Sequence, residues 1–166
     1  MTATESSRQL ALTAAQAAAD KLASDILLID VSDRLALTDC FVLATGANER
    51  QVGAIVDEVT ERLGRAGVKP LRREGERDGR WVLLDFLDVV VHVQHAEERV
   101  FYALDRLWKD CPTIPFTDAA ESAAADADGD RTGIQGDSAD PSAPSGADAA
   151  GELPDDGERR ADGTGR

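Results

Sequence analysis

Small apolar residues recur at helical spacing near the start of the chain. Within residues 6–23, an alanine or a leucine stands at every fourth position, the repeat that places side chains on one face of a helix. Ser6 or Ser7 is available as the N-cap. The many alanines favour a helix and give it a thin side that can approach a sheet closely. We therefore predict a helix whose inner face carries Leu10, Ala14, Ala18 and Leu22.

A second helical pattern follows the break at Gly46-Ala47-Asn48. Asn48 and Gln51 have the spacing of a capping box, in which each residue satisfies a free amide at the helix start. Gly67 is placed to end the helix as its C-cap. The positions between them that have helical spacing are Val52, Ile55, Val56, Val59 and Leu63.

A third helix is predicted over residues 95–110, HAEERVFYALDRLWKD. Two prolines, Pro112 and Pro115, follow it and stop it. The residues expected to face inward are Val100, Tyr102 or Ala103, and Leu107.

Four shorter apolar stretches have the composition of strands, and they span residues 25–31, 40–45, 81–86 and 88–93. The last two stand too close together for anything but an antiparallel hairpin. Residues 70–80 hold at most one short strand and are otherwise a loop. The element order α-β-β-α-β-β-α predicts an α/β (α+β) fold: a mixed β-sheet of four to five strands flanked by helices.

The hairpin stretch WVLLDFLDVVVHV, residues 81–93, has two distinct faces. Val82, Leu84 and Phe86 share one face of its first strand, and Trp81, Leu83 and Asp85 share the other. A face that carries a carboxylate resists burial, so the Trp81 face is the one expected to meet a partner. Large aromatic side chains often carry the energy of an interface, which makes Trp81 a candidate anchor. Burial of Trp81 in the core stays open as the alternative.

Three interpretations of Asp85 and Asp88 are open. Aspartates that flank a two-residue turn commonly satisfy the turn amides, and this interpretation is favoured by the local sequence. A carboxylate pair also binds divalent metals or shares acid–base work. Finally, the two charges would suit the rim of a binding surface.

The composition changes abruptly after Phe116. Residues 118–166 carry 13 acidic side chains against 4 basic ones, so most of the formal net charge of −14 lies there. Such a polar segment cannot bury enough apolar area to offset its ordering entropy, roughly 1–2 kcal/mol per residue for the backbone. We therefore predict a domain over residues 1–116 and a disordered acidic tail over residues 117–166.

The remaining motifs give little support to an enzyme. His92 and His95 lack the third and fourth ligands of a zinc site. The arginines of residues 70–80 alternate with acids and have no aromatic residue among them to stack on bases, so no direct sequence-specific binding of nucleic acid is expected. TGANERQ, residues 45–51, lacks a nucleotide-binding fingerprint. No cofactor and no catalytic residue is predicted.

The chain has no secretory signal and no apolar stretch long enough to span a membrane. Its two cysteines, Cys40 and Cys111, form no CxxC motif and suit a reducing cytoplasm. The acidic balance argues against broad binding of phosphate backbones and favours a protein partner with a basic patch.

Three linked motifs resemble the ribosomal silencing factor family (RsfS, also called Iojap). They are TDCFVLATGANERQV (38–52), WVLLDFLDVVVHV (81–93) and ERVFYALDRLW (98–108), in the same order and spacing as in the family. With the connecting segments, the resemblance covers about residues 8–112, and the acidic tail falls outside it.

The resemblance implies a binding protein that is not an enzyme. Members of the family dock on a large-subunit ribosomal protein, number fourteen in the standard naming, at the intersubunit face. They thereby block joining of the small subunit and lower translation when nutrients run short. The family fold is nucleotidyltransferase-like without the catalytic motif, and here Asp-x-Asp occurs only within the tail. The residues that we expect to contact the ribosomal protein are Trp81, Leu83, Asp85, Asp88, His92, Asp39, Arg99 and Tyr102.

One departure from the family concerns the hairpin turn, where Leu87 stands at a position that is often glycine. The turn must therefore form without a residue that freely takes a positive φ. Two further hypotheses accompany the main one. Exposed apolar strand residues would allow the free protein to form a homodimer. Asp85 and Asp88 would be the metal ligands if the protein were a metal-dependent nucleotidyltransferase-like enzyme.

Overall fold

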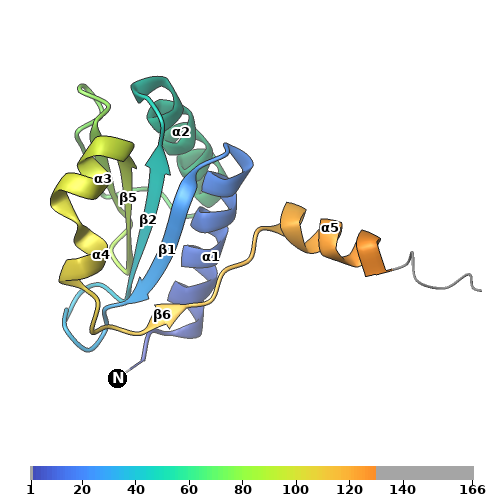
Figure 1. The fold of residues 1–166 in the computed structure, drawn as a ribbon. Coiled ribbons are helices and arrows are strands. Elements are labelled where there is room, and N and C mark those ends of the chain that lie inside the picture. The colour runs from blue at the N-terminus through green and yellow to red at the C-terminus, as the bar shows by residue number, and fades with distance from the viewer. Residues whose placement is uncertain (1, 130–166) are drawn as a thin grey trace, which may run out of the picture. The chain divides into compact units, whose positions relative to one another are not determined.

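The computed structural model describes residues 2–129, with the side chains of residues 2–125 (Figure 1). These residues lie in the first of two units into which the chain divides, Met1–Arg131 and Thr132–Arg166. The part of the predicted acidic tail after residue 129 lies outside the described residues.

A mixed six-stranded sheet forms the centre of this first unit, in the order β3-β4-β5-β2-β1-β6. β2 and β5 pair in parallel at the middle, and the other neighbours are antiparallel. The mixed sheet confirms the predicted fold class. The strands are β1 (Ser24–Asp30), β2 (Cys40–Gly46), β3 (Arg72–Glu74), β4 (Trp81–Asp85), β5 (Val89–His95) and β6 (Thr113–Ile114).

The predicted number of four to five strands is one too low because β6 was missed. β6 has only two residues, and it pairs with Leu28 and Ile29 at the edge of the sheet. So short a strand shows no alternation of polar and apolar side chains, and the prolines on either side of it suggested a loop.

Helices α1 (Glu5–Asp20) and α2 (Glu49–Arg65) cover one face of the sheet (Figure 1). The thin side of α1 consists of fully buried alanines that include Ala14 and Ala18, as predicted. Leu22 does not belong to this face: it follows the helix with a φ of 61° and is 83% exposed. The N-cap also differs from the prediction, because Thr4, and neither Ser6 nor Ser7, accepts the amide of Ser7.

The predicted N-cap of α2 is confirmed, whereas its C-cap is Ala66, one residue before the predicted Gly67. The Asn48 side chain accepts the amide of Gln51 at 2.9 Å, and Gln51 Oε1 accepts the amide of Ala47 at 2.7 Å. At the other end Gly67 has a φ of 85°, a left-handed conformation that glycine adopts without strain, and its amide donates to Gly64.

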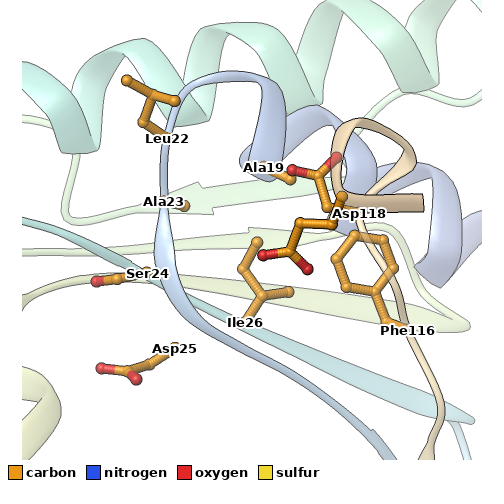
Figure 2. A pocket seen from close by; sticks show the side chains of 9 residues that line it. Ala19, Leu22, Ala23, Ser24, Asp25, Ile26, Phe116 and Asp118 are labelled. Carbon is orange, nitrogen blue, oxygen red and sulfur yellow. The ribbon is translucent and has the colours of Figure 1, made fainter. Parts of the chain in front are cut away.

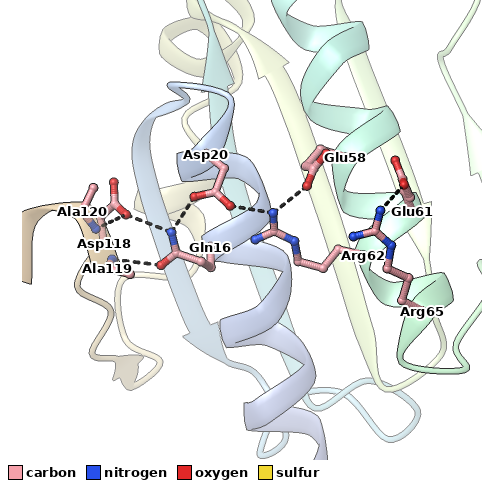
Figure 3. Close-up of polar contacts among 9 residues, drawn as sticks. All are labelled: Gln16, Asp20, Glu58, Glu61, Arg62, Arg65, Asp118, Ala119 and Ala120. Atoms are coloured by element: carbon pink, nitrogen blue, oxygen red, sulfur yellow. Dashed lines mark hydrogen bonds and ion pairs between the residues drawn. The ribbon is translucent and has the colours of Figure 1, made fainter. Parts of the chain in front are cut away.

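Polar side chains link α1 to α2 and to the segment that follows β6 (Figure 3). Arg62 contacts Asp20 and Glu58 at 2.6 Å each, so one guanidinium joins the two helices. Gln16 donates to Asp20 at 2.8 Å and to Asp118 at 2.9 Å. These contacts fix the position of α1 across the sheet on its solvent side.

The predicted third helix is broken into two short helices on the other side of the sheet, α3 (Ala96–Tyr102) and α4 (Leu104–Leu107) (Figure 1). The break is Ala103, which has left-handed φ and ψ values of 45° and 50°. On the two sides of this break, the residues expected to face inward are exposed, Val100 by 80% and Leu107 by 71%. The prediction that these two residues face inward is therefore wrong.

A last helix, α5 (Ala119–Gly129), lies where the sequence predicted a disordered segment. That prediction is wrong for residues 119–129. Its first turn is held by the Asp118 side chain, which accepts the amide of Ala120, and by Gln16, which accepts the amide of Ala119. Among the described residues, no helix combines the length and the apolar content that a membrane span requires.

Candidate partner-binding surface

The sheet face under α3 and α4 carries the residues predicted for partner binding on β4. Trp81, Leu83 and Asp85 are half-buried on this face, while Val82 and Leu84 are buried on the other. The predicted division of the hairpin into two faces is therefore confirmed. Leu83 pairs with His92 across the β4–β5 register, which brings His92 to the same face.

Five ring side chains gather there, and we call them the aromatic cluster: Phe41, Trp81, His92, Tyr102 and Trp108. The Trp81 and Tyr102 rings are 4.6 Å apart between centroids. Phe41 lies edge-on to both His92 at 5.1 Å and Trp108 at 5.2 Å. Offset and edge-on geometries are the favourable arrangements of aromatic pairs, so the cluster is a packed unit with a preformed shape.

His92 lies at the centre of the cluster and is buried. Its Nδ1 accepts a hydrogen bond of 3.2 Å from the indole Nε1 of Trp81, which requires the neutral imidazole. Burial lowers the pKa of His92 to about 4. At neutral pH the side chain is therefore uncharged and orients Trp81, and it is too enclosed to reach a partner directly.

Beside the cluster, large apolar side chains project into solvent, and we call Val100, Phe101 and Leu107 the outer ridge. Val100 and Phe101 are each 80% exposed, and Phe101 lies edge-on to Tyr102 at 5.0 Å. A shallow hollow of about 510 Å³ adjoins them, lined by Ala96, Glu97, Val100 and Phe101. Large apolar side chains that are contiguous and exposed are typical of binding surfaces.

Arg99 anchors α3 to the sheet from below. Its Nη1 donates to Thr45 Oγ1 at 3.0 Å, and its Nε lies 3.8 Å from Asp105. Only 9% of Arg99 is exposed, and burial lowers the pKa of its guanidinium. Arg99 is thus placed to hold the surface in position, and its charge is largely withdrawn from a partner.

The acidic residues of the predicted site are spread over different places. Asp85 Oδ1 accepts the amide of Leu87 at 2.9 Å, and its other oxygen lies 3.8 Å from Arg72. Asp88 is exposed at the turn. The turn interpretation of Asp85 is therefore confirmed, and Leu87 takes a φ of 73° in the absence of glycine.

The backbone amide of Asp39 donates to the carbonyl of Asp88 at 2.8 Å, but the Asp39 side chain is bound to the start of α1 and not to the aromatic cluster. Its Oδ2 accepts hydrogen bonds from the Ser7 hydroxyl at 2.7 Å and from the Thr4 amide and hydroxyl at 3.1 Å each. The hydrogen bond from Ser7 is the main reason that the pKa of Asp39 lies below its ordinary value. Asp39 thus ties the start of α1 to the strand that follows it.

Asp85 and Asp88 do not belong to a metal-ligand cluster. Within residues 2–129, the one group of three His, Cys or carboxylate side chains with ligand atoms inside 4.8 Å is His95, Glu97 and Glu98. Both glutamates of that group are hydrogen-bonded to Arg80, which compensates their charge. The metal-dependent interpretation of the aspartate pair has no further support in these contacts.

A separate hollow of about 480 Å³ lies between the end of α1, the start of β1 and the segment before α5 (Figure 2). Its apolar side chains include Ile26 and Phe116, and its charged side chains are Asp25, Asp118 and Glu121. None of the predicted site residues lines it.

The outer ridge is the part of the surface that the sequence did not reveal. Helical spacing in an apparently continuous helix predicts Val100 and Leu107 in the core, and it makes no prediction for Phe101. The available signal was the run Val100-Phe101-Tyr102, whose three consecutive large side chains cannot all face inward on one helix.

Comparisons with known proteins agree on one family. A family model described as "Ribosomal silencing factor during starvation" matches residues 4–140. The chain is 41% identical over 99 residues to the ribosomal silencing factor RsfS of Bacillus subtilis, a match that covers 60% of this chain and 84% of that protein. The corresponding protein of Halalkalibacterium halodurans is 38% identical over 109 residues, with coverage of 66% and 93%.

A solved structure agrees with the fold as well. A protein from Chromobacterium violaceum, whose crystal structure is known, is 37% identical in sequence to this chain. Its structure superposes on this one with a TM-score of 0.59. The match covers 61% of this chain and 84% of that one.

Proposed function

Since this chain belongs to the ribosomal silencing factor family, we propose that it binds the large ribosomal subunit and prevents the small subunit from joining it. The proposed contact surface is the aromatic cluster together with the outer ridge. The proposed partner is the ribosomal protein that the family resemblance implies, number fourteen of the large subunit. The silencing of translation under nutrient limitation would follow from the block to subunit joining.

The single observation that carries this proposal is the outer ridge. Phe101 and Val100 are each 80% exposed next to a packed aromatic cluster, on the sheet face that α1 and α2 leave free. A rigid apolar centre with exposed aromatic side chains is the arrangement in which a few residues supply most of a binding energy. Phe101 is therefore the proposed main anchor. It replaces Trp81, which Tyr102 and His92 partly enclose.

The charges around the ridge support a basic partner. Glu97 has 75% of its side chain exposed and Asp105 has 44%, so their carboxylates, which pair with Arg80 and Arg99 in the free protein, stay accessible to a basic partner beside Val100 and Phe101. Ribosomal proteins present basic surfaces, and an acidic rim around an apolar centre would complement them and speed association.

The mechanism that we propose is steric and includes no chemical step. A domain of roughly 110 residues has a radius of gyration of about 13 Å, so on the intersubunit face it would occupy space that the other subunit needs. The protein would act in the cytoplasm, where ribosomes assemble, and it would need no cofactor.

The test is reassociation of purified ribosomal subunits followed by sedimentation. Added protein is expected to keep the subunits apart, and Phe101→Ser is expected to abolish most of this effect. Leu22→Ser is the matched control, because Leu22 is 83% exposed but lies in the loop between α1 and β1. Whole ribosomes that form undiminished in the presence of the unaltered protein would contradict the proposal.

The outer ridge also bears on the state of the free protein. We propose that two copies cover their ridges against each other when no ribosome is present, because exposed apolar surface favours association. Sedimentation equilibrium should then show a dimer that Phe101→Ser converts to a monomer. A monomer at every concentration of the unaltered chain would contradict it.

A further inference from the structure

We infer that Arg80 is the positioning residue of the partner-binding surface: it fixes the orientation of α3, and through α3 the placement of Tyr102 against Trp81. This inference rests on the proposed function, since the surface that Arg80 positions is the one proposed to bind the large subunit. Nothing in the family resemblance singled out this residue.

Arg80 makes contacts with three carboxylates from two helices. Its Nη2 donates to Glu97 at 2.6 Å, its Nε to Glu98 at 2.8 Å and its Nη1 to Glu49 at 3.1 Å. Each nitrogen of the guanidinium therefore serves a different side chain. Glu97 and Glu98 lie in the first turn of α3, while Glu49 lies in the first turn of α2.

The backbone of Arg80 takes part in the same junction. Its carbonyl accepts the amide of His95 at 2.7 Å, at the point where β5 passes into α3. His95 is in turn the N-cap of α3, since its Nδ1 accepts the amide of Glu97 at 3.2 Å. The amide of His95, the N-cap of α3, is thus bound to the Arg80 carbonyl. The side chains of Glu97 and Glu98, in the first turn of α3, are bound to the Arg80 guanidinium.

The consequence for the binding surface follows from the shortness of α3. The helix has seven residues and ends at Tyr102, so a rotation at its first turn carries over to its last residue. Tyr102 packs on Trp81, the residue directly after Arg80 in the chain, at 4.6 Å between ring centroids. The ridge residue Phe101 is adjacent and would move with it. Arg80 therefore determines whether the aromatic cluster and the outer ridge form one continuous surface.

The geometry requires arginine in particular. A guanidinium presents donors in a planar fork and can serve several carboxylates at once, whereas an ammonium group is a compact charge with a different reach. The three hydrogen bonds raise the pKa of Arg80, with Glu97 as the largest cause, so its charge is constant. About a third of the Arg80 side chain is exposed, 35%, so its ion pairs contribute little to overall stability in water and mainly select one orientation.

The matched control is Arg65, another arginine with a carboxylate partner. It pairs with Glu61 within α2 and has 71% of its side chain exposed, so its loss removes an ion pair without touching α3. Four proteins are compared in the full chain: the unaltered protein, Arg80→Met, Arg80→Lys and Arg65→Met. A fifth, the double variant Glu97→Gln/Glu98→Gln, removes the two ion pairs that Arg80 makes with α3 and leaves the one with Glu49.

Three measurements are made on each protein: the dissociation constant for the purified large subunit, the urea midpoint of unfolding, and the nuclear Overhauser contacts between the Trp81 and Tyr102 rings. Arg80→Met and the double glutamate variant are expected to bind about tenfold more weakly, equivalent to about 1.4 kcal/mol. They are also expected to lose the ring contacts while keeping the urea midpoint of Arg65→Met. Arg80→Lys should restore binding only in part.

Retention of the ring contacts in Arg80→Met, with affinity equal to that of Arg65→Met, would overturn the inference. A fall in the urea midpoint with the ring contacts intact would also overturn it, because Arg80 would then be a general stabilising residue. If the unaltered protein does not bind the large subunit, the proposed function fails, and the ring contacts still decide whether Arg80 positions α3.

Discussion

The two faces of the sheet are built from different side chains and covered to different extents. Under α1 and α2, the packed side chains are mostly aliphatic or alanine, with Phe86 and Cys40 among them, and several, including Leu84 and Ala18, are fully buried. Under α3 and α4, a smaller buried cluster of aliphatic side chains, including Ile29 and Leu43, adjoins the aromatic cluster, and many of the side chains around it are half-buried. Two long helices seal the first face, whereas two short ones, broken at Ala103, cover only part of the second.

The difference separates stability from recognition. The face under α1 and α2 removes apolar area from water, which is the dominant favourable contribution to folding. The face under α3 and α4 buries a smaller cluster and leaves large side chains such as Phe101 in contact with water, where they add little to the stability of the free protein and suit a partner. Changes at the buried residues of the first face should therefore alter the free energy of unfolding, and changes at the exposed residues of the second face should alter binding.

Neighbouring leucines on opposite faces give the largest expected effect. Leu84 is fully buried under α2, so Leu84→Ala should lower the free energy of unfolding by about 2–5 kcal/mol. Leu83 is half-buried on the other face, and Leu83→Ala should cost about 1 kcal/mol but weaken binding to the large subunit. Urea unfolding and a binding titration on both variants check this. Equal losses of stability at the two positions would erase the distinction between the faces.

The pH dependence of stability should trace in part to His92. Its pKa is about 4 in the folded protein against 6.5 ordinarily, so the unfolded chain takes up the proton first as the pH falls. Stability contributed by neutral His92 is therefore complete above pH 6.5 and lost between pH 6.5 and about 4. Since tenfold in proton affinity corresponds to about 1.4 kcal/mol, the loss is roughly 3 kcal/mol.

The measurement is urea unfolding at several pH values for the unaltered protein and for His92→Gln. Glutamine keeps an oxygen that can accept the Trp81 indole, and it does not titrate. The variant should show a flatter decline of stability between pH 6.5 and 4. Parallel curves for the two proteins would mean that His92 titrates normally and is not enclosed as described.

Asp39 tests the attachment of α1 to the sheet. Asp39→Asn weakens three hydrogen bonds that a charged acceptor receives from Thr4 and Ser7, and should lower the free energy of unfolding by about 1–2 kcal/mol at neutral pH. The folded pKa of Asp39 is below 3.8, so the difference from the unaltered protein should shrink as the pH falls below that value. Binding to the large subunit should not change. A loss of binding without a loss of stability would show that Asp39 belongs to the contact surface.

The smallest expected effect concerns the turn of the hairpin between β4 and β5. Leu87 has a φ of 73° and is 49% exposed, so its side chain packs little and its backbone is in a conformation that glycine takes more easily. Leu87→Gly should raise the free energy of unfolding by at most about 1 kcal/mol, because the relief of strain exceeds the entropy that glycine adds to the unfolded chain. Thermal unfolding of the two proteins provides the measurement. A clear decrease in stability would show that Leu87 makes contacts in the fold that outweigh the strain.

The sequence predicted the face under α1 and α2 well, because that face depends on local patterns. The alanine repeat of α1, the capping box of α2 and the alternation of Val82 and Leu84 each follow from one stretch of chain. The other face depends on features that leave no local signal. Ala103 takes a left-handed conformation without being glycine or asparagine, and Val100 before this break and Leu107 after it are both exposed.

Contacts between distant residues were also beyond local patterns. Asp39 was assigned to the partner surface, yet it accepts hydrogen bonds from Thr4 and Ser7. The partners are more than thirty positions away, and only the packing of α1 on the sheet brings them together. The sequence places Arg80 in a loop and gives no sign of its role, because its three carboxylate partners come from two helices.

The most direct test of the central claim is amide hydrogen exchange of the full chain, alone and bound to the purified large ribosomal subunit. Binding should slow exchange in β4, α3 and α4, which carry the aromatic cluster and the outer ridge, and should leave α1 and α2 unchanged. Protection that appears on α1 and α2, or protection absent from α3, would contradict the assignment of the second sheet face to the ribosome.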